Sequence, residues 1–410
     1  MSSKAMDDMR LCIFCETELT DQTKPEHILL NALGGRKTTR WAICSQHNND
    51  FGATIDKALA EMVVTFRNLL QLESGTGKPT PSIQTMNEAG ERLKLRSDGK
   101  PELIEKPFEV AQREKGDFEI RINARNEADI RRAVPHIAAQ TSISEDDVWT
   151  QLAQGGSGAR VRRSAGRIPQ HLQLGGEMSL RAMCKAALCL LAKAVGAAPL
   201  RSDAFSEVRA FVENGDDAFN RSRGSLDPRS LPSANVAEAK YGPLFNLLVV
   251  RSDGAGRVVA HFTLYNLAAW QMVLVEAGGP PDVYVALVSD PLEPSSWSDQ
   301  FASEIDVPFA WLNAPDLSDL YARSTGRMTA ALQVWQERGQ SQLVSDMVKR
   351  AFDAEEPADG SPLDPDAVDR IRARLAEEMA HQLLGVPLEQ PLSAEEIAAM
   401  RAAPANPKKD

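Results

Sequence analysis

The sequence predicts an α+β protein with a small metal-binding domain at its N-terminus, a mixed α+β middle domain and a helical C-terminal region. Three observations favour this class. Two half-sites with zinc-ligand chemistry, Cys12 with Cys15 and Cys44 with His47, lie near the N-terminus. Short β-rich segments with alternating polar and apolar residues, mixed with helical patterns, occupy the middle of the chain. Beyond residue 308 the apolar residues recur with helical spacing.

Length and composition limit the classes of protein that are possible. A chain of 410 residues is too long for one ordinary core, so we expect two or three domains. Its formal net charge of −11 excludes a broadly basic surface, and any contact with phosphates must use a local basic face. No apolar run is long enough for a membrane span, the first ten residues are polar, and the cysteine pairs suit metal in a reducing compartment. We therefore expect a cytoplasmic protein that binds no membrane.

Residues 1–72 are predicted to form the first domain. After the second half-site, apolar residues from Phe51 to Phe66 recur at spacings of three and four, which predicts one helix with a buried face. Asn48 and Asn49 stand where a helix N-cap is expected. Residues 73–82 are rich in Gly, Pro, Ser and Thr, so they are expected to be a linker.

Residues 77–292 are predicted to form a mixed domain with an antiparallel sheet. Residues 91–97 and 117–124 have the pattern of half-exposed strands, and residues 126–140 and 142–154 that of helices, the second with a Ser N-cap. Residues 177–196 form the most apolar helix, expected to be buried on most sides and ended by Gly196. Residues 245–266 predict a hairpin around "SDGAG", and residues 270–275 and 283–288 predict two further strands.

Residues 308–402 are predicted to be helical. The helical patterns cover residues 317–339, 341–356 and 364–385, and an acidic break that contains proline lies at residues 355–366. This acidic region could be a solvated surface, or it could dock a protein partner and cover the N-terminal domain.

The two half-sites predict a structural zinc site. Cys12, Cys15, Cys44 and His47 supply four ligands, with 28 residues between the halves. Such a site leaves no open coordination position for chemistry, and it would stabilise a segment too short to bury much of a core.

An acid directly precedes a histidine at Glu26 and His27. A carboxylate can hold a hard cation such as Mg²⁺, and a neutral imidazole can take a proton from water. On an extended strand the two side chains point to opposite faces, whereas on a bent segment they converge. Taken alone, the pair favours the simpler interpretation, an ordinary surface acid beside a histidine that hydrogen-bonds a loop.

The order of these motifs resembles a known family. Cys-x-x-Cys, then Glu26-His27, then Cys-x-x-His-Asn is similar to the zinc-containing branch of the HNH, or ββα-metal, endonucleases. The stretch "EHILLNALGG", residues 26–35, is similar to the EHI-x-x-x-ALGG stretch of stand-alone bacterial HNH proteins. The resemblance covers residues 11–70.

The resemblance implies a metal-dependent DNA endonuclease. His27 would be the general base, while Glu26 and Asn48 would hold one catalytic Mg²⁺ or Mn²⁺. One such site would nick one strand and leave 5′-phosphate and 3′-hydroxyl ends, and relatives of this kind often act in defence against phage or foreign DNA. His47 replaces the usual fourth cysteine, and Asp56 could replace a missing final histidine as a cation ligand. Asn49 is a rival to Asn48 for the ligand position.

Two basic segments are candidates for nucleic-acid binding. In the first, glycines at positions 34 and 35 would let the backbone approach a ligand closely, and basic side chains could neutralise phosphates. The alternative for both segments is a solvated basic loop. The residues are Arg36, Lys37 and Arg40 in the first segment, and Arg160, Arg162, Arg163 and Arg167 in the second. A further alternative for the whole chain is a catalytically silent zinc-knuckle module that binds nucleic acid or protein.

Overall fold

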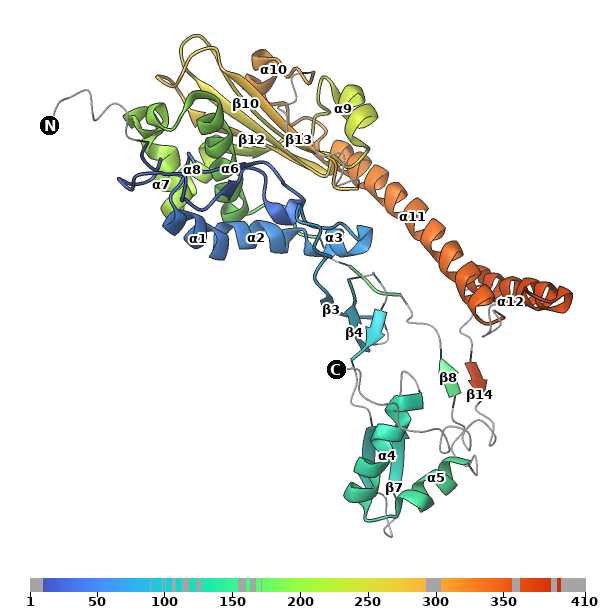
Figure 1. The fold of residues 1–410 in the computed structure, drawn as a ribbon. Coiled ribbons are helices and arrows are strands. Elements are labelled where there is room, and N and C mark those ends of the chain that lie inside the picture. The colour runs from blue at the N-terminus through green and yellow to red at the C-terminus, as the bar shows by residue number, and fades with distance from the viewer. Residues whose placement is uncertain are drawn as a thin grey trace. The chain divides into compact units, whose positions relative to one another are not determined.

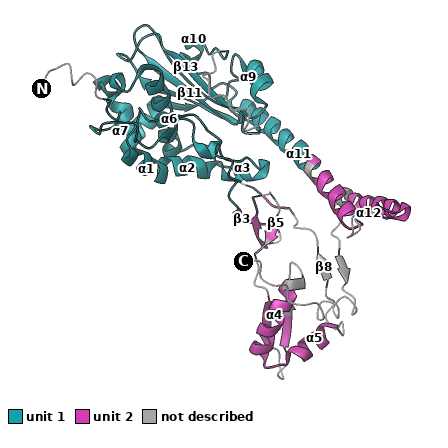
Figure 2. Ribbon diagram, viewed as in Figure 1, with its two compact units in different colours: residues 1–82, 97–99, 170–340 teal, residues 83–96, 100–169, 341–410 magenta. Residues whose placement is uncertain are grey.

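The structure is a computed structural model, and it describes residues 10–88, 90–97, 99, 101–104, 108–112, 118–122, 127–153, 160–162, 167–170, 172–292, 304–355, 362–384 and 389–391 (Figure 1). The chain forms two compact units. Unit 1 comprises residues 1–82, 97–99 and 170–340, and unit 2 comprises residues 83–96, 100–169 and 341–410 (Figure 2).

Unit 1 begins with a short hairpin followed by a helix. Strands β1 (Glu26–His27) and β2 (Thr38–Thr39) pair antiparallel, with Glu26 opposite Thr39 and His27 opposite Thr38. Between them the 3₁₀ turn η2 (Asn31–Leu33) ends at Gly34, whose φ of 91° suits glycine. Helix α1 (Ser45–Ala53) follows. The order β1, β2, α1 is the ββα arrangement that the resemblance implied.

The helical segment after Cys44 differs from the prediction. Three short helices replace the single one: α1, α2 (Ile55–Met62) and α3 (Val64–Leu70). The prediction that Asn48 or Asn49 caps the helix is wrong, because Cys44 is the N-cap and its Sγ accepts a hydrogen bond from the His47 amide. The expected apolar face still packs into the core, through Phe51, Ile55, Leu59, Val63 and Phe66.

Helix α6 (Glu177–Val195) is the centre of unit 1. It packs against α2 on one side and against strands of the large sheet on the other (Figure 1). Most of its side chains are buried, and Gly196 follows its last turn, as predicted. Because α2 belongs to the N-terminal segment, α6 joins that segment to the rest of unit 1 through one hydrophobic core.

The sheet of unit 1 is antiparallel, with strand order β13-β10-β11-β12-β9. The predicted hairpin is confirmed: β10 (Asn246–Ser252) pairs with β11 (Val258–Leu264), and β12 (Ala268–Val275) and β13 (Tyr284–Ser289) are the two further strands. Alternate residues of β10 and β11 enter the core beneath α6 and a second core on the opposite face. Helices α9 (Ala234–Tyr241) and α10 (Phe309–Asn313) contribute to that second core.

Shorter elements complete unit 1. The turns η4 (Ala198–Arg201) and η5 (Asp203–Phe205) lead from α6 to α7 (Ser206–Asn214) and α8 (Asp217–Arg223), and β9 (Gly224–Leu226) then joins the sheet edge. Helix α11 (Leu320–Asp353) belongs to unit 1 up to residue 340.

Unit 2 contains small sheets and helices. Strands β3 (Ile83–Met86), β4 (Arg92–Leu95) and β5 (Pro101–Leu103) form one sheet, and β6 (Phe108–Gln112) pairs with β7 (Phe118–Ile122). Helices α4 (Glu127–Thr141) and α5 (Glu145–Ala153) pack with β6 and β7 around a small apolar cluster. The predicted Ser N-cap is Ser144, whose Oγ accepts from the Asp147 amide at 3.1 Å. Strand β8 (Arg160–Arg162) pairs with β14 (Glu389–Pro391), and α12 (Pro365–Leu384) is the last helix described.

The α+β class predicted from the sequence is confirmed, including the helices toward the C-terminus. The expected domain boundaries, residues 1–72, 77–292 and 308–402, stay a prediction. The boundaries of the two compact units differ from those of the expected domains, because residues 170–340 pack in one body with the N-terminal segment. None of the helices in the described part of the chain combines the length and apolar character needed to cross a bilayer.

Candidate metal centre and active site

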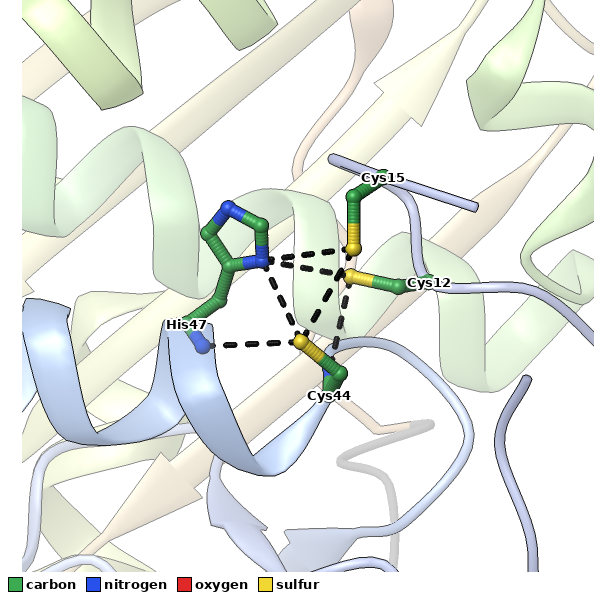
Figure 3. Close-up of side chains that lie close together, drawn as sticks. All are labelled: Cys12, Cys15, Cys44 and His47. Atoms are coloured by element: carbon green, nitrogen blue, oxygen red, sulfur yellow. Dashed lines mark hydrogen bonds between the residues drawn. The ribbon is translucent and has the colours of Figure 1, made fainter. Parts of the chain in front are cut away.

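Cys12, Cys15, Cys44 and His47 converge on one point (Figure 3). The Nδ1 atom of His47 lies 3.7 Å from Sγ of Cys12, 3.7 Å from Sγ of Cys15 and 3.3 Å from Sγ of Cys44. The Sγ atoms of Cys15 and Cys44 are 3.9 Å apart. Tetrahedral zinc with Zn–S bonds of about 2.3 Å requires ligand atoms roughly 3.8 Å apart. The Cys₃His set therefore fits Zn²⁺, and its chemistry is that of a closed structural site.

Backbone amides help to position this cluster. The amides of Phe14 and Cys44 both donate to Sγ of Cys12, at 3.5 and 3.3 Å. Burial raises the pKa of the Cys12 thiol to about 12. Zn²⁺ would offset this effect, because a coordinated thiol is deprotonated.

Two residues distant in sequence support the zinc cluster, and sequence reasoning missed both. Oε1 of Glu213, on α7, lies 3.2 Å from Nε2 of His47, the ring nitrogen that does not face the cysteines. A carboxylate in this position fixes the orientation of a metal-binding imidazole. Nη1 of Arg201 donates to the carbonyl oxygens of Cys12 and Cys15, each at 2.5 Å. The first half-site is thus held by the turn that follows α6.

Glu26 lies beside Asp56, as the predicted cation site requires, but a lysine lies between them. Nζ of Lys185, on α6, is 2.5 Å from Oε1 of Glu26 and 2.6 Å from Oδ2 of Asp56. The side chains are almost completely buried, with exposed fractions of 2% for Lys185, 5% for Glu26 and 8% for Asp56. One ammonium and two carboxylates therefore form a compact buried ion cluster.

The ion cluster keeps Lys185 charged. Burial alone would lower the pKa of Lys185, but the carboxylates of Asp56 and Glu26 outweigh burial and raise it above its usual value. Burial raises the pKa of Glu26, and the ammonium of Lys185 opposes that effect. The Lys185 ammonium takes one oxygen of Glu26 and one of Asp56, two of the residues predicted to hold Mg²⁺ or Mn²⁺, so the position between these two carboxylates does not fit a divalent cation.

His27 lies next to this cluster on β1 and is half-buried. Its pKa is lowered, first by burial and then by the positive charge of Lys185, so the imidazole is neutral at neutral pH. Because Glu26 and His27 form a short strand, their side chains leave it on opposite sides: Glu26 enters the core and His27 remains partly accessible.

Asn48 is buried on α1, and its Nδ2 donates to the carbonyl oxygen of Pro25 at 3.1 Å. This bond ties α1 to the chain directly before Glu26. Asn49, the rival candidate, is exposed, and its Oδ1 accepts from Nζ of Lys24 at 2.6 Å. Of the two asparagines, Asn48 is therefore the one that faces β1.

The Gly34–Arg40 turn presents exposed arginines whose guanidinium groups also brace the loop. Nε of Arg36 donates to the Gly75 carbonyl at 2.8 Å, and Nη1 of Arg40 donates to the Thr23 carbonyl at 2.5 Å. Gly35 packs tightly against the protein's own backbone: a Cβ atom added to it would lie 1.7 Å from the Leu29 carbonyl oxygen. Lys37, at the same turn, is half-buried.

The second basic segment belongs to unit 2. Arg160 and Arg162 lie in β8, paired with Pro391 and Glu389 of β14, so the backbone there is extended rather than the expected open loop. Arg167 is exposed, and its carbonyl oxygen accepts from the Glu88 amide at 3.0 Å. Arg163 lies outside the described residues.

The fold and the cluster define a ββα segment with a Cys₃His site that could bind zinc. Residues 12–64 match the family model of the HNH endonucleases, which confirms the resemblance found in the sequence. The N-terminal segment is thus of HNH endonuclease type, and this supports a nuclease role in general. The chain has no significant match among curated proteins or solved structures.

Proposed function

We propose that the protein is a nuclease that hydrolyses DNA phosphodiester bonds with His27 as general base. The observation that carries the proposal is the position of His27: a half-buried, neutral imidazole on β1 of an HNH-type segment, on the opposite side of the strand from the Glu26 side chain and close to the chain that Asn48 braces. A neutral imidazole with some access to solvent can accept a proton from water.

In the proposed reaction, His27 takes a proton from a water molecule whose oxygen attacks the phosphorus in line. A new P–O bond forms, the bond to the 3′ oxygen breaks, and that oxygen leaves with a proton from solvent. Arg36 and Arg40, with Lys37 at the same turn, would neutralise the DNA backbone next to the scissile phosphate. The ends expected are 5′-phosphate and 3′-hydroxyl.

The biological setting is also a proposal. One site of this kind cuts one strand, so a single chain would nick duplex DNA. Stand-alone nucleases of this type suit defence against phage or other foreign DNA. The helical C-terminal region exposes large apolar side chains that suit a protein partner, among them Tyr321, Trp335, Val344, Phe352 and Met379.

Nicking of supercoiled plasmid tests the proposed nuclease activity. The wild type is expected to nick, and His27→Ala to lose about 10²-fold or more in rate, which is the usual contribution of a general base. His136→Ala, which changes an exposed histidine of unit 2, is the matched control and should nick like the wild type. Equal rates for wild type and His27→Ala would remove His27 from this role.

A second candidate function is favoured by one specific observation. Because Lys185 pairs with both Glu26 and Asp56, the segment could be a catalytically silent module that binds nucleic acid or protein through the folded zinc knuckle. In that case plasmid would not be cut with or without Mg²⁺, and it would be bound only if the module recognises nucleic acid. Gel-shift and nicking assays on one zinc-loaded preparation separate the two functions.

A further inference from the structure

Lys185 is unusual because its charge is directed into the core. Helix α6 buries its neighbours Cys184, Ala186, Ala187 and Leu188 completely or nearly so. From this apolar helix the ammonium donates to two carboxylates, one on β1 and one on α2, and these are its hydrogen-bond acceptors within the described part of the chain. A buried ammonium without these partners would carry a large desolvation penalty.

The ammonium has the contacts that a bound cation would have. It lies within 2.6 Å of one oxygen from each carboxylate that the sequence assigns to the catalytic metal. The position is set by the packing of α6 against α2, and both helices are part of the hydrophobic core of unit 1. Lys185 is therefore fixed by the fold and is not a surface side chain that moves freely.

We propose that the Lys185 ammonium is the resident cation of this HNH segment, so that the folded protein does not bind Mg²⁺ or Mn²⁺ between Glu26 and Asp56. The proposal rests on the proposed function only in treating these two carboxylates as the cation site of the nuclease. Lys185 is then a positioning residue, which holds β1, and with it His27, against α2.

A divalent cation would compete with the Lys185 ammonium for the carboxylates of Glu26 and Asp56. A divalent cation at the two carboxylates would either displace the ammonium or share the site with it. Displacement would leave Lys185 charged and unpaired among apolar side chains, which is strongly unfavourable. Sharing would place like charges a few ångströms apart in a medium of low dielectric constant. Either arrangement is disfavoured as long as residue 185 is a lysine.

Binding of Mn²⁺ tests the proposal without requiring activity. The titration uses full-length, zinc-loaded protein, and the loss of the electron paramagnetic resonance signal of free Mn²⁺ reports binding. Wild type and the control Lys193→Met, which changes an exposed lysine of the same helix, are expected to bind no Mn²⁺ at this site. Lys185→Met leaves two buried carboxylates without a cation and is expected to bind one Mn²⁺.

Thermal unfolding gives a second readout. Excess Mn²⁺, at about a hundred times its Kd, should raise the Tm of Lys185→Met by about 3–5 °C and leave the wild-type Tm unchanged. The triple variant Glu26→Gln, Asp56→Asn, Lys185→Met carries no charge at the site. It should fold and show no response to Mn²⁺.

Two results would overturn the proposal. One is wild-type binding of Mn²⁺ that disappears in Glu26→Gln; this result decides the question even where Lys185→Met does not fold. The other is a folded Lys185→Met that does not respond to Mn²⁺. Both results concern binding alone. A failure of the nuclease proposal would instead appear as absent plasmid cleavage, whatever the Mn²⁺ titration shows.

Discussion

At the scale of single residues, the N-terminal segment depends on side chains that lie far away in sequence. Glu213 orients His47, Arg201 holds the carbonyl groups of Cys12 and Cys15, and Lys185 joins the two carboxylates. Each contact satisfies a polar or charged group that would otherwise be poorly solvated. The zinc ligands are therefore only part of what builds the site.

Glu213→Gln should weaken zinc binding by about 10- to 100-fold, because the variant loses the charge that orients and polarises His47. Competition with a chromophoric chelator measures the affinity. Glu207→Gln is the matched control, since Glu207 lies on the same helix and its carboxylate contacts Arg223. If both variants held zinc as tightly as the wild type, Glu213 would have no role in the metal centre.

The buried His261 should make the free energy of unfolding depend on pH. Burial lowers its pKa to about 4; Asp227 opposes this shift, while Arg327 and Arg229 add to it. As the pH falls, His261 is protonated in the unfolded state before it is protonated in the folded state. The free energy of unfolding is therefore not reduced by this group above about pH 6.5, and it falls by about 3 kcal/mol as the pH drops from 6.5 to 4. Urea unfolding of the wild type and His261→Gln measures it. The variant should lose less stability over this range, and parallel pH profiles would contradict the assignment.

At the scale of helices and strands, the pattern of residue types along the sequence predicted much of the fold. The hairpin of β10 and β11, the buried helix α6 and the Ser144 cap follow from local patterns, and all are present. The zinc ligands could be predicted because each pair lies within four consecutive residues, so that its spacing is visible in the sequence. The segment after Cys44 was predicted less well, because the sulfur of Cys44 caps α1 and the helix is interrupted at Thr54 and Val63.

Two glycines of the N-terminal segment should respond oppositely to alanine. Gly35→Ala would press its Cβ against the Leu29 backbone, so it should destabilise unit 1 strongly. Gly52→Ala, in α1 with nothing within 4 Å of the added carbon, should stabilise it by roughly 0.5–1 kcal/mol. Thermal unfolding measures both, and equal effects of the two substitutions would mean that the Gly35 approach is not rigid.

At the scale of the whole molecule, the HNH-type segment is completed by residues 170–340, which share unit 1 with it. The partners Lys185 and Glu213 could not be predicted, since no local pattern tells which distant helix packs against β1 or α1. One signal did exist: Lys185 lies within the most apolar stretch of residues 177–196, and a lysine that is buried there needs an acid as its partner. Residues 1–72 are therefore not expected to carry the complete site on their own.

Hydrolysis at an HNH-type site with His27 as general base can be tested through the chemistry of the cut ends. Plasmid nicked by the full-length, zinc-loaded protein is treated with DNA ligase. We expect ligase alone to reseal the nicks, because they carry 5′-phosphate and 3′-hydroxyl groups, and we expect His27→Ala to yield almost no nicked product. Nicks that ligase cannot reseal, or an equal yield from His27→Ala, would contradict it.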